Sequence, residues 1–81
     1  MDKIENLVLT KEMINTLKEL RELQNSGRKF SADEIKNPLT HVYSENLAEP
    51  VTHDLEGGKL PGVELTDFGW EVLKYIDEHQ K

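Results

Sequence analysis

The sequence predicts an α+β domain, because two kinds of apolar periodicity alternate along one short chain. Apolar residues recur at helical spacing near both ends, and between them residues 51–55 alternate apolar and polar side chains just before two adjacent glycines. The chain has 81 residues, with no internal repeat, low-complexity segment or linker. This length corresponds to one domain, which we expect to cover residues 1–81.

The composition excludes several classes of protein. There is no cysteine, so disulfides, thiolate metal sites and a cysteine nucleophile are ruled out, and a reducing, cytoplasmic location is favoured. The longest apolar run, Leu7-Val8-Leu9, is far too short to span a bilayer. The first five residues lack the basic and apolar stretches of a signal peptide. We therefore expect a cytoplasmic protein with no membrane partner.

The first helix is expected to begin after Thr10, whose hydroxyl can cap free N–H groups of the first turn. It should end near Gly27, since glycine readily adopts the left-handed conformation that terminates helices. The segment before it, residues 4–9, fits either an added helical turn or a short strand. The apolar positions of the helix fall on one face: Met13, Ile14, Leu17, Leu20 and Leu23.

Two short helices joined by a tight turn are expected next, after an extended piece at residues 28–30. Ser31 and Glu34 have the spacing of a capping box, which predicts the start of the second helix. That helix must end before Pro38, while Asn37 followed by Pro38 predicts the start of a third helix with asparagine as its N-cap. Residues 48–50 break the third helix, whose apolar face is predicted to be Leu39, Val42, Tyr43 and Leu47.

A β-hairpin and a last helix complete the expected order. The adjacent glycines Gly57 and Gly58 permit a tight turn after the strand at residues 51–55. In the return strand, residues 60–65, Pro61 suggests an edge position or a bulge. Thr66 is the predicted N-cap of the last helix, and Trp70 lies about 60° outside its apolar face. That face comprises Phe68, Val72, Leu73, Tyr75 and Ile76.

This order of elements resembles a winged helix-turn-helix domain, with three helices, a β-hairpin wing and a C-terminal helix. The passage Leu65-Thr66-Asp67-Phe68-Gly69-Trp70-Glu71-Val72-Leu73 is similar to the L-T-x-x-G-x-x-x-L passage after the wing of bacterial MarR-type and PadR-type regulators and of small prophage-associated winged-helix proteins. The resemblance implies a recognition helix at residues 38–47 and a wing at residues 51–65. It also implies a small bacterial or phage regulator of transcription that binds double-stranded DNA.

Seven side chains are candidates for contact with DNA under this resemblance. The N-terminal part of a recognition helix enters the major groove, which would bring Thr40, His41 and Ser44 near base edges. Cations beside that helix and at the tip of the wing would contact phosphates. These cations are Arg28, Lys29, Lys36 and Lys59.

The charge distribution weighs against DNA and supports a second interpretation. Residues 1–30 carry six basic and five acidic side chains, whereas residues 31–81 carry four basic and eleven acidic ones, within a net charge of −6. The expected recognition helix contains no arginine or lysine, which most such helices use. The alternative function is an acidic protein–protein interaction module, an accessory or inhibitor protein that does not bind DNA.

A protein interface is expected on the last helix, either with a second copy of the chain or with another protein. Trp70, with Lys74 one turn later, is the candidate anchor, because exposed tryptophan is enriched in interface hot spots. The alternative is that Trp70 packs beneath the N-terminal segment, against Ile4, Leu7 or Val8.

Catalytic and metal chemistry find little support in the sequence. The three histidines are too dispersed for metal-ligand spacing, and neither Ser31 nor Ser44 has a base at a suitable spacing. We expect no enzyme activity, no cofactor and no metal site.

Overall fold

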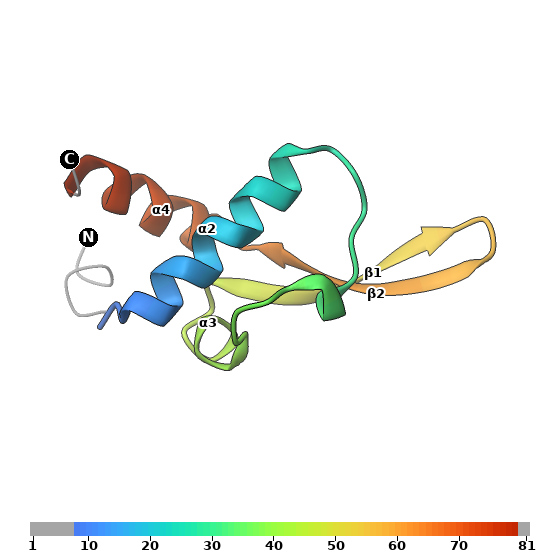
Figure 1. Cartoon of the computed structure of the whole chain (residues 1–81), viewed down its shortest axis with the longest axis horizontal. Helices are drawn as coiled ribbons and strands as arrows, with labels where there is room; N and C mark the ends of the chain where they lie inside the picture. The colour runs from blue at the N-terminus through green and yellow to red at the C-terminus, as the bar shows by residue number, and fades with distance from the viewer. Residues whose placement is uncertain (1–7, 80–81) are drawn as a thin grey trace.

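The structure is a computed structural model that describes residues 8–79 (Figure 1). It is α+β, with a helix-rich N-terminal part, an antiparallel two-stranded hairpin and a C-terminal helix. The elements in chain order are α2 (Lys11–Asn25), the 3₁₀ turn η1 (Ala32–Glu34), α3 (Thr40–Ser44), β1 (Ala48–Leu55), β2 (Gly58–Leu65) and α4 (Asp67–His79).

The first helix forms as predicted. The Thr10 hydroxyl accepts a hydrogen bond from the backbone N–H of Met13 at 3.1 Å, and Gly27, with φ +78°, lies just beyond the last turn. Most of the segment before it, residues 4–7, lies outside the described residues, and residues 8–10 form neither helix nor strand. Val8 is 77% exposed.

The second predicted helix is only the single turn η1. Its capping box is confirmed, since Ser31 Oγ accepts from Asp33 N at 3.2 Å and Glu34 Oε2 accepts from Ser31 N at 2.9 Å. The chain turns extended at Ile35. The backbone N–H groups of residues 36 and 37 then donate to a carboxylate of α2 instead of continuing the helix.

The third predicted helix, residues 38–47, is reduced to Thr40–Ser44, and the prediction that Asn37 caps it is wrong. The Asn37 side chain donates to Glu19 Oε1 at 2.8 Å, and Leu39 precedes the helix without any side-chain cap. The helix ends early because Asn46 adopts a left-handed φ of 64°. Leu47 remains fully buried although it lies beyond the helix.

The hairpin is longer than predicted, since β1 begins at Ala48 and β2 begins at Gly58. Leu55 pairs with Gly58 across a two-residue turn, and the register continues to Ala48 and Leu65 without a bulge. Pro61 therefore occupies an edge position, which is the first of the two alternatives left open by the sequence.

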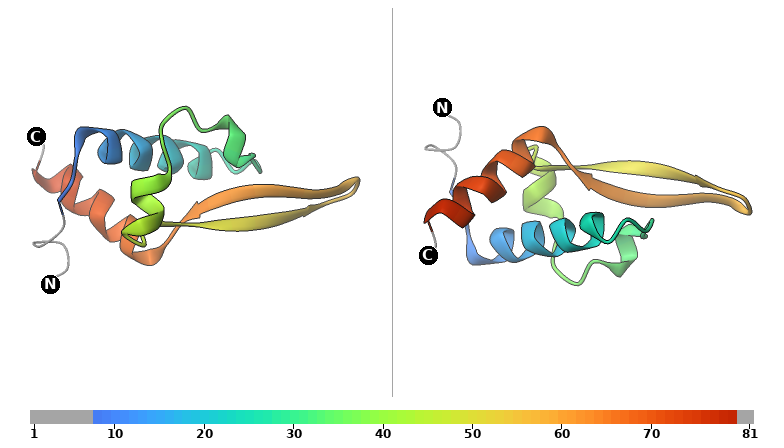
Figure 2. Two further views of the ribbon diagram at one scale, coloured as in Figure 1. Left: turned by 90° about the horizontal axis from the view of Figure 1, so that it is seen from below. Right: turned by 90° about the horizontal axis from the view of Figure 1, so that it is seen from above.

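The core lies where the root of the hairpin meets α2, α3 and α4, and the outer half of the hairpin projects away from it (Figures 1 and 2). Residues 54–59, around the turn, are all exposed. The buried apolar side chains are Met13, Leu17, Leu20, Phe30, Val42, Leu47, Ala48, Val63, Leu65, Val72, Leu73 and Ile76.

The passage that begins at Leu65 forms the joint between the hairpin and α4. Thr66 Oγ1 accepts from Gly69 N at 3.0 Å, which confirms the predicted cap, and donates to the carbonyl oxygen of Asn46 at 2.6 Å. The backbone N–H of Thr66 donates to Leu47 O at 3.0 Å. A Cβ on Gly69 would overlap that same Leu47 oxygen. The helix can therefore approach the chain after α3 only with glycine at this position.

We expect Gly69→Ala to lower the free energy of unfolding by about 2–4 kcal/mol, because the added methyl forces the joint apart. Helix propensity alone would favour alanine by up to about 1 kcal/mol, so the sign of the effect is diagnostic. Urea unfolding followed by Trp70 fluorescence measures it. Gly57→Ala is the control, since a Cβ there meets nothing within 4 Å. Equal stability of the two variants would contradict the conclusion that the contact between α4 and Leu47 requires glycine at position 69.

Candidate nucleic-acid interface

The turn before α3 is held by the side chain of Glu19 on α2. Glu19 Oε2 accepts from Lys36 N at 3.0 Å, and Glu19 Oε1 accepts from Asn37 N at 3.2 Å and Asn37 Nδ2 at 2.8 Å. One turn earlier on α2, the buried hydroxyl of Thr16 lies 2.9 Å from the carbonyl oxygens of both Pro38 and Glu12, which share its single hydrogen. These contacts fix the start of α3 against α2.

The hydrogen bonds to Glu19 change its acidity. Burial acts to raise the pKa of its carboxyl group, but the N–H donors of Lys36 and Asn37 and the charge of Lys36 outweigh burial and hold the pKa below its ordinary value. The folded structure therefore stabilises the charged carboxylate form of Glu19.

The helix α3 presents a polar face to solvent and an apolar face to the core. Thr40, His41 and Ser44 are exposed, as predicted, whereas Val42 is fully buried. The Ser44 hydroxyl donates to the His41 carbonyl oxygen at 3.1 Å. The helix has five residues, a length of about 7.5 Å, so its exposed face is small.

The predicted phosphate contacts do not form one basic surface. Arg28 is paired with Glu34 at 2.6 Å, and this hydrogen bond holds the pKa of the Glu34 carboxyl group below its ordinary value. Lys29 Nζ donates to the backbone oxygen of Asp54 at 3.4 Å, and Lys59 is the cross-strand partner of Asp54. The structure thus brings Lys29 and Lys59 to one part of the hairpin.

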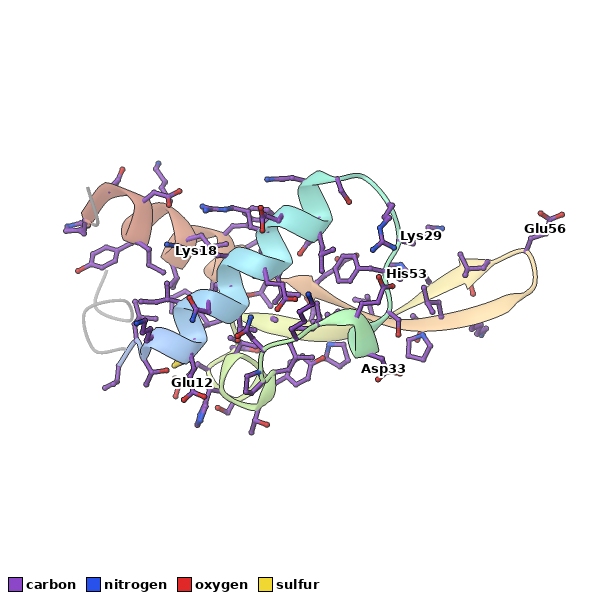
Figure 3. The ribbon with its side chains drawn as sticks, in the orientation of Figure 1. Glu12, Lys18, Lys29, Asp33, His53 and Glu56 are labelled. Atoms are coloured by element: carbon purple, nitrogen blue, oxygen red, sulfur yellow. The ribbon has the colours of Figure 1, made fainter. Side chains whose placement is uncertain are left out.

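The remaining cation, Lys36, lies in the turn before α3 and is exposed. Acidic side chains are interspersed with these cations, as Figure 3 shows for Asp33 on η1 and Glu56 at the hairpin turn. The surface around α3 and the hairpin is therefore of mixed sign, with Arg28 neutralised within the chain.

The contact between Phe30 and His53, which holds the loop after α2 against the hairpin, was not predicted from the sequence. The half-buried ring of His53 (labelled in Figure 3) lies on the hairpin. Its centroid is 6.5 Å from that of the Phe30 ring. A Cβ on Gly62 would lie 2.6 Å from His53 Nε2 and 2.9 Å from the Phe30 carbonyl oxygen, so only glycine permits this approach. Gly62 following Pro61 was the available signal, but it was interpreted only as an edge position or a bulge.

Glu19 was also missed, because its partners lie 17 and 18 residues further along the chain. No local pattern marks a glutamate at the border of an apolar face as a ligand for distant backbone groups. Its position between Leu17 and Leu20, which are both fully buried, was the only indication.

The predicted interface residues on α4 differ in burial. Trp70 is half-buried and packs against the core, so it does not stand on a wholly polar face as the sequence suggested. Lys74 is exposed one turn later. Of the alternative partners of Trp70, Ile4 and Leu7 lie outside the described residues, and Val8 is 77% exposed. A role of Trp70 and Lys74 in a protein interface stays a prediction.

Within residues 8–79, no three histidine or carboxylate side chains gather in a group that could hold a metal ion. None of the helices in this part of the chain is long and apolar enough to cross a membrane. Comparisons with protein-family models, with curated proteins and with solved structures find no match for the chain.

We expect Glu19→Gln to lower the free energy of unfolding by about 1–3 kcal/mol at pH 7, because a neutral amide accepts these hydrogen bonds poorly. Since the pKa of Glu19 is lowered by folding, its contribution is fully present above the unfolded pKa, about 4.3, and is lost as the pH falls through the folded value.

Denaturation of both proteins across pH 2–8 tests this expectation (roughly the range in which glutamate titrates). The gap in stability between wild type and Glu19→Gln should close at acid pH. The control is Glu22→Gln, on the exposed part of the same helix. A gap that is independent of pH would refute the proposed role of the Glu19 charge.

Proposed function

We propose that the chain is a winged helix-turn-helix protein that associates with double-stranded DNA and regulates transcription. In this proposal α3 is the recognition helix and the β1–β2 hairpin is the wing. The observation that carries the proposal is the exposed polar face of α3, which Glu19 and Thr16 fix to α2 beside a projecting hairpin (Figure 2). A short helix held in this way can meet a groove without rearranging.

The roles of the site residues follow from their positions. Thr40, His41 and Ser44 would reach base edges, where hydroxyl and imidazole groups can donate or accept hydrogen bonds. The available cations, Lys29, Lys36 and Lys59, would contact phosphates. Because Arg28 is paired with Glu34, we propose that it supports the loop and does not contact DNA.

We expect wild type to bind random duplex DNA weakly, with a slope of log K against log salt of about −3, since three cations remain available. Lys36→Ala and Lys59→Ala should each bring the slope closer to zero by about one unit. Fluorescence polarisation with a labelled duplex at several salt concentrations measures the slope.

The matched control for that titration is Lys74→Ala, because Lys74 lies on α4, away from α3 and the hairpin turn. It should leave the slope unchanged. No binding by wild type at tens of micromolar in low salt would reject the DNA function, because this concentration lies within the usual range of non-specific dissociation constants, roughly 1–100 μM.

A second candidate function, binding to a basic protein partner, is favoured by one observation. Glu49 and Glu64 are direct cross-strand partners near the root of the hairpin, and both are exposed. Like charges placed directly opposite each other destabilise a sheet. A carboxylate pair that the fold maintains at this cost is suited to a partner that supplies positive charge, and unsuited to phosphate.

We expect Glu64→Lys to raise the free energy of unfolding by about 0.2–1 kcal/mol, because it replaces a like-charge pair with an opposite-charge pair. Thermal or urea unfolding measures the change. Glu56→Lys at the hairpin turn makes the same change in net charge without facing a carboxylate across the strands. An equal gain from both variants would show that net charge, and not the Glu49–Glu64 pair, is responsible.

A further inference from the structure

The two edges of the hairpin differ in how far the rest of the protein covers them. On the edge of β2, Val63 is fully buried, and the backbone N–H of Leu65 donates to Gln24 Oε1 on α2 at 2.6 Å. The other strand, β1, lies on the side of the hairpin away from α2 in both views of Figure 2. An uncovered edge presents unpaired N–H and C=O groups that invite pairing with a strand of another chain. The edge of β1 is therefore the place where this sheet can be extended.

The register determines which backbone groups of β1 point outward. Leu55 and Gly58 flank a two-residue turn, so they form a hydrogen-bonded pair, and such pairs alternate with non-hydrogen-bonded pairs along the ladder. The outward residues along the projecting part of β1 are therefore Pro50, Thr52 and Asp54, and all three are exposed. From the Pro50 carbonyl through Thr52 to the Asp54 N–H, no backbone group of residues 8–79 bonds to this outward run.

The two ends of this run are deficient in opposite ways. Pro50 has no N–H to donate, and the outward oxygen of Asp54 already has Lys29 Nζ at 3.4 Å. When two β1 strands pair antiparallel about Thr52, Pro50 of one copy lies opposite Asp54 of the other. The missing donor then faces the one acceptor that Lys29 supplies, so the pairing strands no carbonyl oxygen at either end.

The same register pairs the remaining outward groups. The two Thr52 residues form a hydrogen-bonded pair and exchange N–H···O bonds, while the N–H of each Asp54 donates to the Pro50 carbonyl oxygen of the other copy. Moving the centre by one residue, to Val51, would place Pro50 opposite Thr52 and leave the Thr52 oxygen without a donor. The edge of β1 is thus complementary to itself when the pairing is centred on Thr52.

The side chains of β1 are compatible with this register. Glu49 of one copy lies opposite Leu55 of the other, and Asp54 lies opposite Pro50, so no carboxylate of the strand directly faces another. The two Thr52 side chains face each other. Threonine pairs stabilise a sheet, whereas like charges placed directly opposite would destabilise it.

We propose that two copies of the chain pair antiparallel through β1, about a two-fold axis at Thr52. Their hairpins then form one sheet in the order β2–β1–β1–β2. A two-stranded hairpin is marginally stable by itself, and the projecting half of this one gains the neighbouring strand that it lacks. Because the strands run in opposite directions, the helical parts of the two copies lie toward opposite ends of the shared sheet. This pairing does not depend on whether the chain binds DNA.

The substitution Thr52→Pro tests the pairing, because the N–H that it removes points away from β2 and the hairpin keeps its own ladder. Wild type should dimerise with a dissociation constant below about 1 mM, in salt of about 0.15 M to screen the repulsion between chains of net charge −6. Thr52→Pro should weaken dimerisation about tenfold or more, since both central hydrogen bonds are lost. Sedimentation equilibrium measures the dissociation constant.

The matched control is Thr52→Val, which keeps the N–H and a β-branched side chain and should dimerise like wild type. A wild type that stays monomeric up to about 1 mM would overturn the proposal. A folded Thr52→Pro variant that dimerises as strongly as wild type would overturn it as well.

A second measurement uses wild type alone and does not depend on the folding of any variant. Amide hydrogen exchange, followed by NMR as the protein concentration rises, should show protection of the outward N–H groups of Thr52 and Asp54 growing with the fraction of dimer. Lys59 is an outward residue on β2 and serves as the internal control, because its N–H should stay unprotected. Protection that grows equally at Lys59, or fails to grow at Thr52, would contradict pairing through β1.

Discussion

The close approach of Gly69 to the carbonyl oxygen of Leu47 is the constraint on which the remaining structure depends. It lets the first turn of α4 lie directly against the chain that leaves α3, where Thr66 joins Asn46, Leu47 and Gly69 through its backbone and its hydroxyl group. The left-handed conformation of Asn46 turns the chain from α3 into β1 at this point. The hairpin, α3 and α4 therefore share one joint, around which the core of the domain closes.

The position of α3 depends on groups outside α3. A helix of five residues cannot be stable by itself, because it forms too few hydrogen bonds to offset nucleation. The carboxylate of Glu19 and the hydroxyl of Thr16 supply the missing order from α2, and Val42 adds one buried apolar contact. The surface proposed for DNA is thus arranged by a negative charge that lies behind it, so charge at this site serves structure as well as recognition.

Local physics explains what the sequence predicted and what it did not. The helix α2, the turn of the hairpin, the capping box of η1 and the cap of α4 follow from periodicity and from contacts within four residues, and all were predicted. The lengths of the second and third helices were not predicted, because Glu19 accepts a hydrogen bond from the Asn37 side chain 18 residues away and so prevents Asn37 from capping α3. The Arg28–Glu34 pair escaped prediction because it closes only when the loop between them folds. Which exposed side chains contact a partner stays a prediction.

The short length of α3 limits how much DNA sequence the helix can recognise. Three exposed side chains distinguish about three base pairs, at about 1–3 kcal/mol for each well-formed contact. A three-base-pair sequence recurs about every few dozen base pairs in any genome, so a single copy of this domain would find matching sites almost everywhere. A protein that recognises DNA in this way must gain selectivity from a second DNA-binding domain bound to the same duplex at a fixed spacing.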